Sequence, residues 1–488
     1  MPEVATFPRT SPEIQGVPSK AILAFLGAVE RNIRDLNSLI VLRHGAVIAE
    51  GYWEPYGPSN PHMLFSLSKS FTSTAIGLLV SERRLTVDDL VLDLFADKAP
   101  ADPNPSNNLK AMRVRDLLTM TTGHNTEPPR PFGEAAASWM SVFLGHPVEH
   151  QPGTHFLYNS MATYMLSAIV QRLTGQRLVD YLQPRIFEPL GIQNPTWESS
   201  PEGINTGGWG LSITTLDIAR FGQLYLQRGV WQGKQLIPES WVAAATSRQV
   251  PNAPNANPDW EQGYGYQFWR CRHGAYRGDG AFGQFCVVLP EQDTVLAITS
   301  GVGNMQAVLD LVWEHLLPAL GPDQLPDATA TTAELSNRLA GLRLPLASGR
   351  LSSPRATALS GREYQLQDNL DGVESVRFDF AADGGILTIK NDRGEEQITC
   401  GSAHWVRGQV TTLGSPRALG TEASVAKVAA SGAWKDDETY VAEICWYETP
   451  FRRTLTCHFD GSEVSIEQTM NVGFGTQQPP RLVGKAGT

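Results

Sequence analysis

Runs with the pattern of β-strands lie at both ends of the first 320 residues, and helical patterns lie between them. Near the N-terminus, two β-rich runs flank His44-Gly45, which predicts a hairpin over residues 38–53. Three more strands are predicted within residues 264–300, as YGYQFWR, AFGQFCVVLP and TVLAITS. One antiparallel sheet assembled from both ends satisfies this pattern, with the middle of the chain as a separate helical lobe. A cleft between sheet and lobe is a natural place for a site.

Helical periodicity supplies the elements that cover such a sheet. Apolar residues at helical spacing predict helices over Ser19–Asn32 and 66–84. A third helix is predicted at 214–229, with a threonine cap and a glycine stop, and a last one at 305–317. Helices and Pro/Gly-rich loops fill residues 85–200. We therefore expect a mixed α/β (α+β) fold.

The composition changes after residue 320. Residues 321–349 are rich in Pro, Ala, Thr and Gly and predict a linker with one short helix near 333–342. Alternating apolar and polar residues over 350–488 predict an antiparallel β domain, either a barrel or a sandwich. The 488 residues thus divide into a domain at 1–320, a linker and a C-terminal domain. That second domain could act as a lid, an oligomerisation surface or a substrate gate.

The formal net charge of -11 argues against binding to nucleic acid or to anionic lipid. The chain shows no secretory signal at its start and no apolar run of about 18–20 residues. The five cysteines are odd in number and lack CxxC spacing, which suits a reducing compartment. We expect a cytoplasmic protein without a nucleic-acid or membrane partner, and leave homo-oligomerisation open.

A Ser-x-x-Lys motif, Ser66-Leu67-Ser68-Lys69, opens the helix predicted at 66–84. Residues three apart share a helix face, so the Ser66 hydroxyl and the Lys69 amine can meet. Serine needs a base to become a nucleophile, and lysine is that base only where burial or a helix terminus lowers its pKa. Taken alone, the motif is a weak signal and better fits a capped helix with a solvent-facing lysine. Ser68 and Ser70 are rival hydroxyls, but neither has a lysine three residues later.

Five segments, in this order along the chain, resemble those of the serine β-lactamase and penicillin-binding-protein family. The resemblance is to its class C β-lactamase-related branch, with family VIII carboxylesterases, D-aminopeptidases and 6-aminohexanoate-dimer hydrolase. It covers about residues 14–317 and implies a β-lactamase/transpeptidase-like fold and a serine hydrolase without cofactor or metal. The segments are HMLFSLSKSFTSTAIGLLV, RVRDLLTMTTGH, PGTHFLYNSMATYMLSAIVQRLTG, GGWGLSITTLDIARFGQLYL and GDGAFGQFCVVLPEQDTVLAIT.

The resemblance implies a role for each matching residue. Ser66 would be acylated, and Lys69 would accept or relay its proton. Tyr158 would be the second general base or acid and would protonate the leaving group, with its pKa lowered by the nearby ammonium. The backbone amides of Ser66 and Ala281 would form the oxyanion hole.

The resemblance also implies a set of substrate contacts. Outside it, core packing would explain Tyr158 and Trp209, and a bulge would explain Gly280 and Gly283. Within it, Trp209 becomes a wall of the cleft. The predicted substrate-binding residues are Ser160, Trp209, Asp279, Gly280 and Phe282.

The chain departs from the family at two motifs. The family's Tyr-x-Asn reads Tyr158-Asn159-Ser160, so the amide that would orient a substrate carbonyl is missing or comes from Asn159 in another geometry. The family's Lys-Thr-Gly becomes Gly-Asp-Gly around Asp279, with Arg277 as the alternative cation nearby.

An acidic residue at position 279 should repel an anionic substrate, by on the order of 1 kcal/mol in a partly buried site. We therefore expect a poor β-lactamase that prefers neutral or cationic substrates. Esters rank above amides because they are easier acyl donors.

Alternatives remain open. They are D-aminopeptidase or other amide hydrolysis, weak β-lactamase activity, a penicillin-binding sensor without turnover, and acyl transfer to an alcohol or amine. A Ser-His-Asp reading through His124, His155 or His273 is disfavoured, since no G-x-S-x-G elbow accompanies them. No HExxH or clustered ligand pattern indicates a metal.

Overall fold

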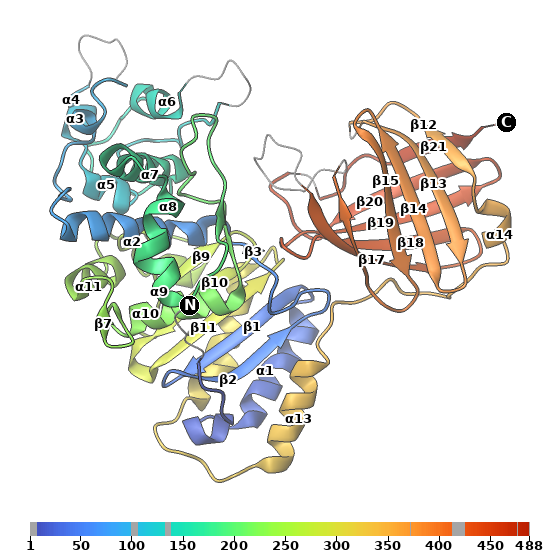
Figure 1. Ribbon diagram of the computed structural model, residues 1–488, viewed down its shortest axis with the longest axis horizontal. Helices are drawn as coiled ribbons and strands as arrows, with labels where there is room; N and C mark the ends of the chain where they lie inside the picture. The colour runs from blue at the N-terminus through green and yellow to red at the C-terminus, as the bar shows by residue number, and fades with distance from the viewer. Residues whose placement is uncertain are drawn as a thin grey trace.

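The computed structural model describes residues 7–98, 106–131, 138–370, 372–411, 425–475 and 477–487. The chain folds into a helix-and-sheet domain and a C-terminal β domain beside it (Figure 1). The first domain carries a helical lobe on one side of its sheet, as the sequence predicts.

The sheet of the first domain has the strand order β2-β1-β11-β10-β9-β8 and is antiparallel throughout its described strands. The N-terminal hairpin lies directly beside the last of the later strands, with Leu39 opposite Ile298. The prediction of one sheet built from both ends is confirmed. The strands are β1 (Leu36–Arg43), β2 (Ala46–Tyr52), β8 (Trp269–Arg270), β9 (Tyr276–Gly280), β10 (Gln284–Leu289) and β11 (Thr294–Ser300).

Helices cover both faces of this sheet. Successive strand residues point to opposite sides, so the residues of one strand belong to both layers. Leu39 and Val41 belong to one buried cluster, and Ile40 and Leu42 to the other. Both faces are therefore apolar, as expected for a sheet packed between two layers. One layer contains α1 (Ser19–Asn32) and α12 (Met305–Leu311), and the other α2 (Ser68–Ser81) and α10 (Thr215–Leu226).

The helical lobe fixes the start of its longest helix, α7 (Ser160–Thr174). The Asn159 side chain caps that helix by accepting a hydrogen bond from the Ala162 amide, at 3.1 Å. The cap fixes the backbone at Asn159 and therefore the position of Tyr158, the residue before it. The other helices are α3 (Val91–Leu94), α4 (Asn107–Ala111), α5 (Val114–Leu118), α6 (Trp139–Gly145), α8 (Leu178–Leu182), α9 (Glu188–Leu190) and α11 (Glu239–Thr246).

A small sheet joins the segment before the Ser-x-x-Lys motif to the glycine-rich segment around Trp209. Its strand order is β3-β5-β4, and Met63 pairs with Ser212. Backbone hydrogen bonds thereby fix the segment before Ser66 relative to the segment around Trp209. The strands are β3 (His62–Met63), β4 (Thr196–Trp197) and β5 (Leu211–Ile213).

Two predicted boundaries are wrong. Residues 264–270 form a strand only at Trp269–Arg270. The strand begins only after Gln267, because Gln267 has a φ of +64° and its side-chain amide donates to the carbonyls of Leu117 and Leu118. The helix predicted from residue 66 begins at Ser68 instead, after a 3₁₀ turn at Phe65–Leu67.

The segment predicted as a linker carries a helix that packs on the first domain. Helix α13 (Thr329–Ala340) contacts α1 and β2, and its Leu335 lies in the same buried cluster as α1. Beyond it, the Leu344 amide donates to the Glu54 carbonyl at 2.8 Å. The chain is therefore attached to the first domain along most of the way to the second.

The C-terminal domain is a barrel, which decides between the two predicted architectures. Its strands run β15-β14-β13-β12-β21-β20-β19-β18-β17, and a parallel pairing of β15 with β17 closes the ring among the described residues. Closure leaves no free sheet edge within that ring. The domain contains α14 (Ala356–Leu359), β12 (Glu363–Leu366), β13 (Val373–Ala381), β14 (Gly384–Asn391), β15 (Gly394–Gly401), β16 (Val406–Val410), β17 (Ala426–Trp434), β18 (Thr439–Cys445), β19 (Arg452–Asp460), β20 (Glu463–Met470) and β21 (Leu482–Ala486).

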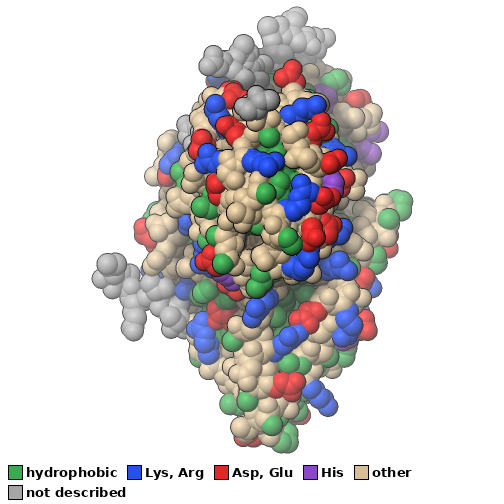
Figure 2. Space-filling view, turned by 90° about the vertical axis from the view of Figure 1, so that its right-hand side faces the viewer, with side chains coloured by type: hydrophobic (Ala, Val, Ile, Leu, Met, Phe, Trp, Pro, Cys, Tyr) green, Lys and Arg blue, Asp and Glu red, His purple; other side chains and the backbone are tan. Residues whose placement is uncertain are grey.

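The surface seen from the barrel side carries mixed charge. Lysine and arginine side chains alternate with aspartate and glutamate over the face in Figure 2, without a broad area of one sign. Among the described helices, none is both long enough and apolar enough to cross a bilayer.

Candidate active site

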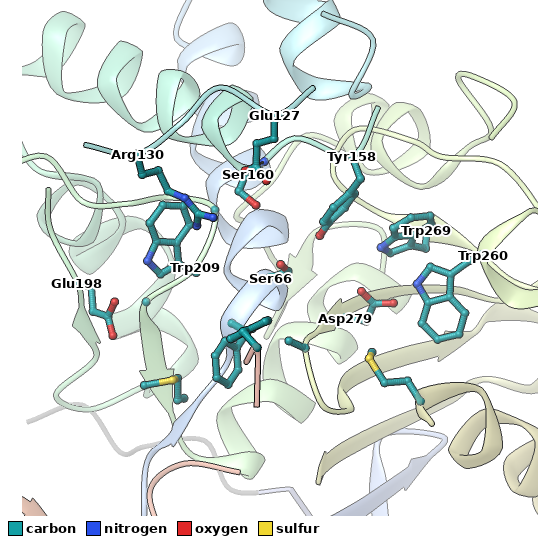
Figure 3. Close-up of a pocket in the computed structure, with 17 residues that line it drawn as sticks. Ser66, Glu127, Arg130, Tyr158, Ser160, Glu198, Trp209, Trp260, Trp269 and Asp279 are labelled. Carbon is teal, nitrogen blue, oxygen red and sulfur yellow. Dashed lines mark hydrogen bonds between the residues drawn. The ribbon is translucent and has the colours of Figure 1, made fainter. Parts of the chain in front are cut away.

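Ser66 lies in the 3₁₀ turn directly before α2, at the floor of a cavity of about 510 Å³ (Figure 3). The residue before it, Phe65, has a φ of +47°, which is uncommon for a side chain of this size. Such backbone strain persists only where the surroundings enforce it, and it is frequent at functional sites. The turn leaves Ser66 partly exposed to the cavity while Phe65 and Leu67 are buried.

Lys69 is 1% exposed and contacts three oxygen atoms. Its Nζ lies 3.0 Å from Ser66 Oγ, 3.2 Å from Ser160 Oγ and 2.7 Å from the carbonyl oxygen of Gly208. Burial lowers the pKa of Lys69 to about 7; Glu127 and Asp279 oppose the shift, and Arg130 adds to it. The structure thus brings the two residues of the motif into contact, with Ser66 in the 3₁₀ turn and Lys69 at the start of α2.

The rival serines are excluded from the cavity. Ser68 and Ser70 are fully buried, and neither lines the cavity wall. The Ser68 hydroxyl accepts from the Leu211 amide at 3.1 Å, and the Ser70 hydroxyl donates to the Gln267 carbonyl at 2.9 Å. Both hydroxyls hold α2 against its neighbours.

Tyr158 reaches the same cavity from the lobe and is hydrogen-bonded to Ser66. Its ring centre lies 4.9 Å from Lys69 Nζ and stacks on Trp269 at 5.3 Å. The predicted direction of its pKa is wrong. Burial, and then the negative charge of Asp279, raise the pKa of Tyr158, and the hydrogen bond to Ser66 only partly offsets them. A phenol in this position keeps its proton at neutral pH.

Ser160 occupies the position where the resemblance places an asparagine. Its hydroxyl accepts from Lys69, and its backbone amide donates to Glu127 at 2.9 Å. Asn159 is fully buried and does not line the cavity, since its side-chain oxygen caps α7. An asparagine amide is therefore missing from the Tyr158–Ser160 wall of the cavity.

Asp279 lines the cavity but does not act as an isolated charge. Arg277, two residues earlier on β9, is fully buried and holds the Asp279 carboxylate through Nε and Nη2, each at 2.8 Å. Burial raises the pKa of Asp279, while Arg277, Lys69 and Trp269 lower it. Arg277 itself packs its guanidinium 4.1 Å from the Trp260 ring centre and is not part of the cavity wall. The repulsion expected at position 279 is therefore weakened by this ion pair.

The glycines beside Asp279 let β9 pass close to the nucleophile turn. A Cβ atom on Gly280 would lie 2.0 Å from the Leu64 carbonyl oxygen, and one on Gly278 2.5 Å from the Leu67 side chain. Only a residue without a side chain fits such an approach. The approach brings Ala281, which also lines the cavity, to the same edge as Ser66.

Of two further predicted contact residues, Trp209 and Phe282, only Trp209 lines the cavity. Trp209 lines the cavity and is 8% exposed, with the Arg130 guanidinium 5.0 Å from its ring centre. Phe282 is not a lining residue; it lies behind Ala281 and packs its ring 5.5 Å from that of Phe65.

Several wall residues were not predicted from the sequence. Figure 3 places Arg130, Trp209 and Glu198 on one side of Ser66, and Tyr158, Trp269, Trp260 and Asp279 on the other. Glu127 and Arg130 follow the TTGH segment in a Pro-rich stretch, and Phe474 stands between two glycines, whereas Glu198 has no comparable signal in the sequence. The unpredicted lining residues include Met63, Phe65, Glu127, Arg130, Glu198, Trp260, Trp269, Met305 and Phe474.

The described residues contain no group of three or more His, Cys, Asp or Glu side chains placed to hold a metal ion. Residues His124, His155 and His273 do not line the cavity around Ser66. His124 packs on Phe143, His155 stacks on His150, and His273 packs on Trp313.

The chain is similar to known proteins in sequence and in fold. The sequence profile of the Beta-lactamase family matches residues 29–311. A 6-aminohexanoate-dimer hydrolase from Paenarthrobacter ureafaciens is 26% identical over 282 residues, covering 53% of this chain and 71% of the relative. Penicillin-binding protein 4 from Amycolatopsis lactamdurans is 24% identical over 304 residues, covering 55% of this chain and 79% of the relative. A predicted β-lactamase from Bacteroides dorei shares the fold, with a TM-score of 0.51 and 17% identity over 61% of this chain and 98% of its own.

Proposed function

Because the chain belongs to the β-lactamase family of serine hydrolases, we propose that it cleaves a carboxylic ester through an acyl-enzyme on Ser66. One observation carries the proposal: Lys69 Nζ lies 3.0 Å from Ser66 Oγ in a buried site that lowers its pKa to about 7. Near neutral pH, roughly half of the lysine side chains are then neutral amines. A neutral amine beside a partly exposed serine is what nucleophile activation requires.

The three contacts of Lys69 suit a transfer of the Ser66 proton to its amine. An ammonium donates three hydrogen bonds, and three acceptors surround it. When one proton is lost, the two remaining N–H groups stay on the Gly208 carbonyl and the Ser160 hydroxyl. The free lone pair then faces Ser66 Oγ and can take its proton.

Acylation forms one bond and breaks one. Ser66 Oγ attacks the substrate carbonyl carbon as its proton passes to Lys69, and the carbonyl oxygen becomes an oxyanion. The amides of Ser66 and Ala281 are the proposed donors to that oxyanion. The bond to the leaving oxygen then breaks, Tyr158 protonates the departing alcohol, and the Lys69 ammonium supplies the replacement proton.

Deacylation repeats the sequence with water. The water gives a proton to Lys69, and the water oxygen attacks the acyl carbon. The bond from that carbon to Ser66 Oγ then breaks, and the proton returns to Ser66 Oγ. The products are a carboxylic acid, an alcohol and the original enzyme.

A linear amide is the second candidate substrate, and the protonated state of Tyr158 favours it. An amine leaving group needs a proton as the carbon–nitrogen bond breaks, and the raised pKa of Tyr158 keeps the phenol protonated. The name of the 6-aminohexanoate-dimer hydrolase relative points to the same bond type. β-Lactams rank lower because Gly278 stands where the Lys-Thr-Gly motif has its lysine, so that cation is missing, and the adjacent Asp279 brings a carboxylate to the cavity wall. Its pairing with Arg277 weakens the repulsion of an anionic substrate but does not replace the lysine.

The proposed setting is the cytoplasm, with a small-molecule substrate. The five cysteines are all buried and unpaired, which suits a reducing compartment.

Activity on a panel of substrates tests the proposal. Pure protein is assayed with p-nitrophenyl esters, linear amides, D-amino-acid amides and β-lactams, and Ser66→Ala is compared with Ser68→Ala. We expect ester turnover that Ser66→Ala loses and Ser68→Ala retains. Undiminished turnover by Ser66→Ala would refute the acyl-enzyme. A stable adduct without turnover would point instead to a penicillin-binding sensor, and product capture by added alcohol to acyl transfer.

A further inference from the structure

The C-terminal barrel contacts the chain immediately before the nucleophile. The Met63 amide donates to the carbonyl oxygen of Glu448 at 2.9 Å, in the turn between β18 and β19. The Phe65 ring packs edge-on against Phe451 of the same turn, with ring centres 6.1 Å apart. Met63 and Phe65 belong to the buried apolar cluster of the barrel rather than to either cluster of the first domain.

This contact is anchored by polar groups on both sides. The Arg452 guanidinium forms an ion pair with Asp35 of the first domain at 2.9 Å. The Asn471 side chain donates to the carbonyl of Gly301 at 3.1 Å, and the Tyr56 hydroxyl donates to the carbonyl of Thr449 at 2.8 Å. Fixed contacts of this kind hold the barrel in one position relative to Ser66.

Phe474 extends from the barrel into the wall of the cavity. Its ring centre lies 5.8 Å from that of Phe65 and 4.9 Å from that of Phe282, yet the side chain is 69% exposed. Phe474 lines the same cavity as Ser66, and ligand cavities are lined mainly by apolar and aromatic side chains. Its neighbours Gly473 and Gly475 have no side chains to crowd the opening.

The position of Phe474 relative to the reacting groups indicates which part of a substrate it contacts. In the proposed reaction the leaving group departs past Tyr158, whose ring stacks on Trp269. Phe474 instead packs on Phe65, which is bonded directly to Ser66, and on Phe282, which follows Ala281. Phe474 therefore lies on the side of the cavity formed by the nucleophile turn and the proposed oxyanion hole, where the acyl group would be attached.

We propose that Phe474 forms an apolar wall of the acyl-group subsite, so that the barrel selects the acyl chain of the substrate. The inference rests on the proposed function and adds its acyl specificity to it. Of the three roles open for the C-terminal domain, it favours the substrate gate. The barrel serves as a fixed wall rather than a moving lid, since Phe474 is attached to an anchored domain.

Two ester series separate the acyl side from the leaving side. The first varies the acyl chain of p-nitrophenyl esters from acetyl to decanoyl, and the second varies the alcohol of acetate esters. The variants are Phe474→Ala and Phe474→Leu, with Leu370→Ala as the control, because Leu370 is exposed on the barrel away from this cavity. Removing an exposed side chain leaves the fold intact.

We expect Phe474→Ala to lower kcat/KM for octanoyl relative to acetyl esters about tenfold, the effect of losing one apolar contact of this size. Phe474→Leu should lose less, and the alcohol series and Leu370→Ala should keep the wild-type profile. An unchanged acyl profile in Phe474→Ala overturns the inference, and so does an equal change in both series.

Covalent labelling distinguishes this failure from failure of the proposed function. Wild-type protein and Phe474→Ala are treated with alkyl fluorophosphonates of increasing chain length, and the rate of modification at Ser66 is followed by mass spectrometry. A rate that depends on chain length in the wild type and less in the variant supports the inference. The same dependence in both proteins overturns the inference alone. An unmodified Ser66 in the wild type overturns both the inference and the proposed function.

Discussion

Lys69 and its surroundings set the chemistry of the site at the scale of single residues. The amine is buried beside Ser66, with Glu127, Arg130 and Asp279 as the charges that act on it. Burial is the largest influence and lowers the pKa, so the base would be present in its working form near neutral pH. The charges around it then tune that value in opposite directions.

The pH dependence of kcat/KM should reveal this tuning. Below about pH 7 the Lys69 ammonium predominates and cannot take the Ser66 proton, so activity should rise with pH and level off above 7. Glu127→Gln removes a charge that raises the Lys69 pKa and should move this limb to lower pH. Arg130→Gln removes a charge that lowers it and should move the limb to higher pH. Each shift should be roughly half a pH unit, equivalent to about 0.7 kcal/mol.

The exposed, distant Glu239→Gln is the control for these profiles and should leave the limb in place. Shifts of the same sign in the two site variants would contradict the assignment of the limb to Lys69.

Replacing the base itself gives a larger effect. Lys69→Met keeps a long side chain but removes the amine, and it should lower kcat/KM by about 10²–10⁴. Lys20→Met, at an exposed position, should be silent. Steady-state kinetics on one ester with both variants decides the matter, and a nearly active Lys69→Met would point to another base.

At the scale of elements, the contact between strand β9 and the turn at Phe65–Leu67 positions the nucleophile. Strand β9 and the turn at Phe65–Leu67 approach so closely that Gly280 has no space for a side chain. This contact fixes where Ser66 and Ala281 stand relative to each other. A change at one glycine is therefore expected to disturb the whole catalytic edge.

Gly280→Ala tests that contact. The added carbon would meet the Leu64 carbonyl oxygen at 2.0 Å, so the turn that carries Ser66 must shift. We expect a loss of about 1–3 kcal/mol in the free energy of unfolding. We also expect kcat to fall by more than the smaller fraction of folded protein would account for. Gly303→Ala, where nothing lies within 4 Å of the new carbon, should change stability by less than about 0.5 kcal/mol. Equal unfolding midpoints for both variants in urea would contradict the close approach.

Elements with a strong local pattern could be predicted from the sequence. The β1–β2 hairpin and α1 follow from β-rich and helical periodicity, and the Ser66–Lys69 contact follows from their spacing on one helix. The strand predicted over 264–270 was wrong because the positive φ of Gln267, set by distant carbonyls, has no local signature.

Site residues that depend on tertiary packing could not be predicted. Glu127 and Phe474 reach the cavity from loops that are remote in sequence, one in each domain. The pKa of Tyr158 was predicted in the wrong direction because its burial outweighs the effect of a nearby cation. The pairing of Arg277 with Asp279 was not predicted: the sequence suggested Arg277 only as an alternative cation, although alternate residues of one strand share a face.

The two domains share apolar clusters and ion pairs at the scale of the whole molecule. Trp405 and Tyr447 of the barrel lie in the cluster that covers one face of the first domain's sheet. Arg452 bridges Asp35 of the first domain and Glu443 of the barrel, with all three side chains at most 15% exposed. The barrel and the first domain should therefore unfold together rather than as independent units.

Arg452→Met tests this coupling. It removes the shared cation and leaves two largely buried carboxylates without it, so we expect a loss of about 2–4 kcal/mol in the free energy of unfolding. Arg228→Met breaks a pair between exposed side chains and should cost less than about 1 kcal/mol. Calorimetry should show one transition in the wild type. Two well-separated transitions in the wild type, or equal losses in the two variants, would contradict the coupling.

Modification by an alkyl fluorophosphonate, followed by intact-mass and peptide mass spectrometry, determines whether Ser66 is the nucleophile. We expect one adduct per wild-type chain on the peptide that contains Ser66, formed faster as the pH rises through about 7. Ser66→Ala should gain no adduct, and Ser68→Ala should be labelled like the wild type. An adduct on Ser66→Ala, or one that maps to Ser68 or Ser70, would contradict the account.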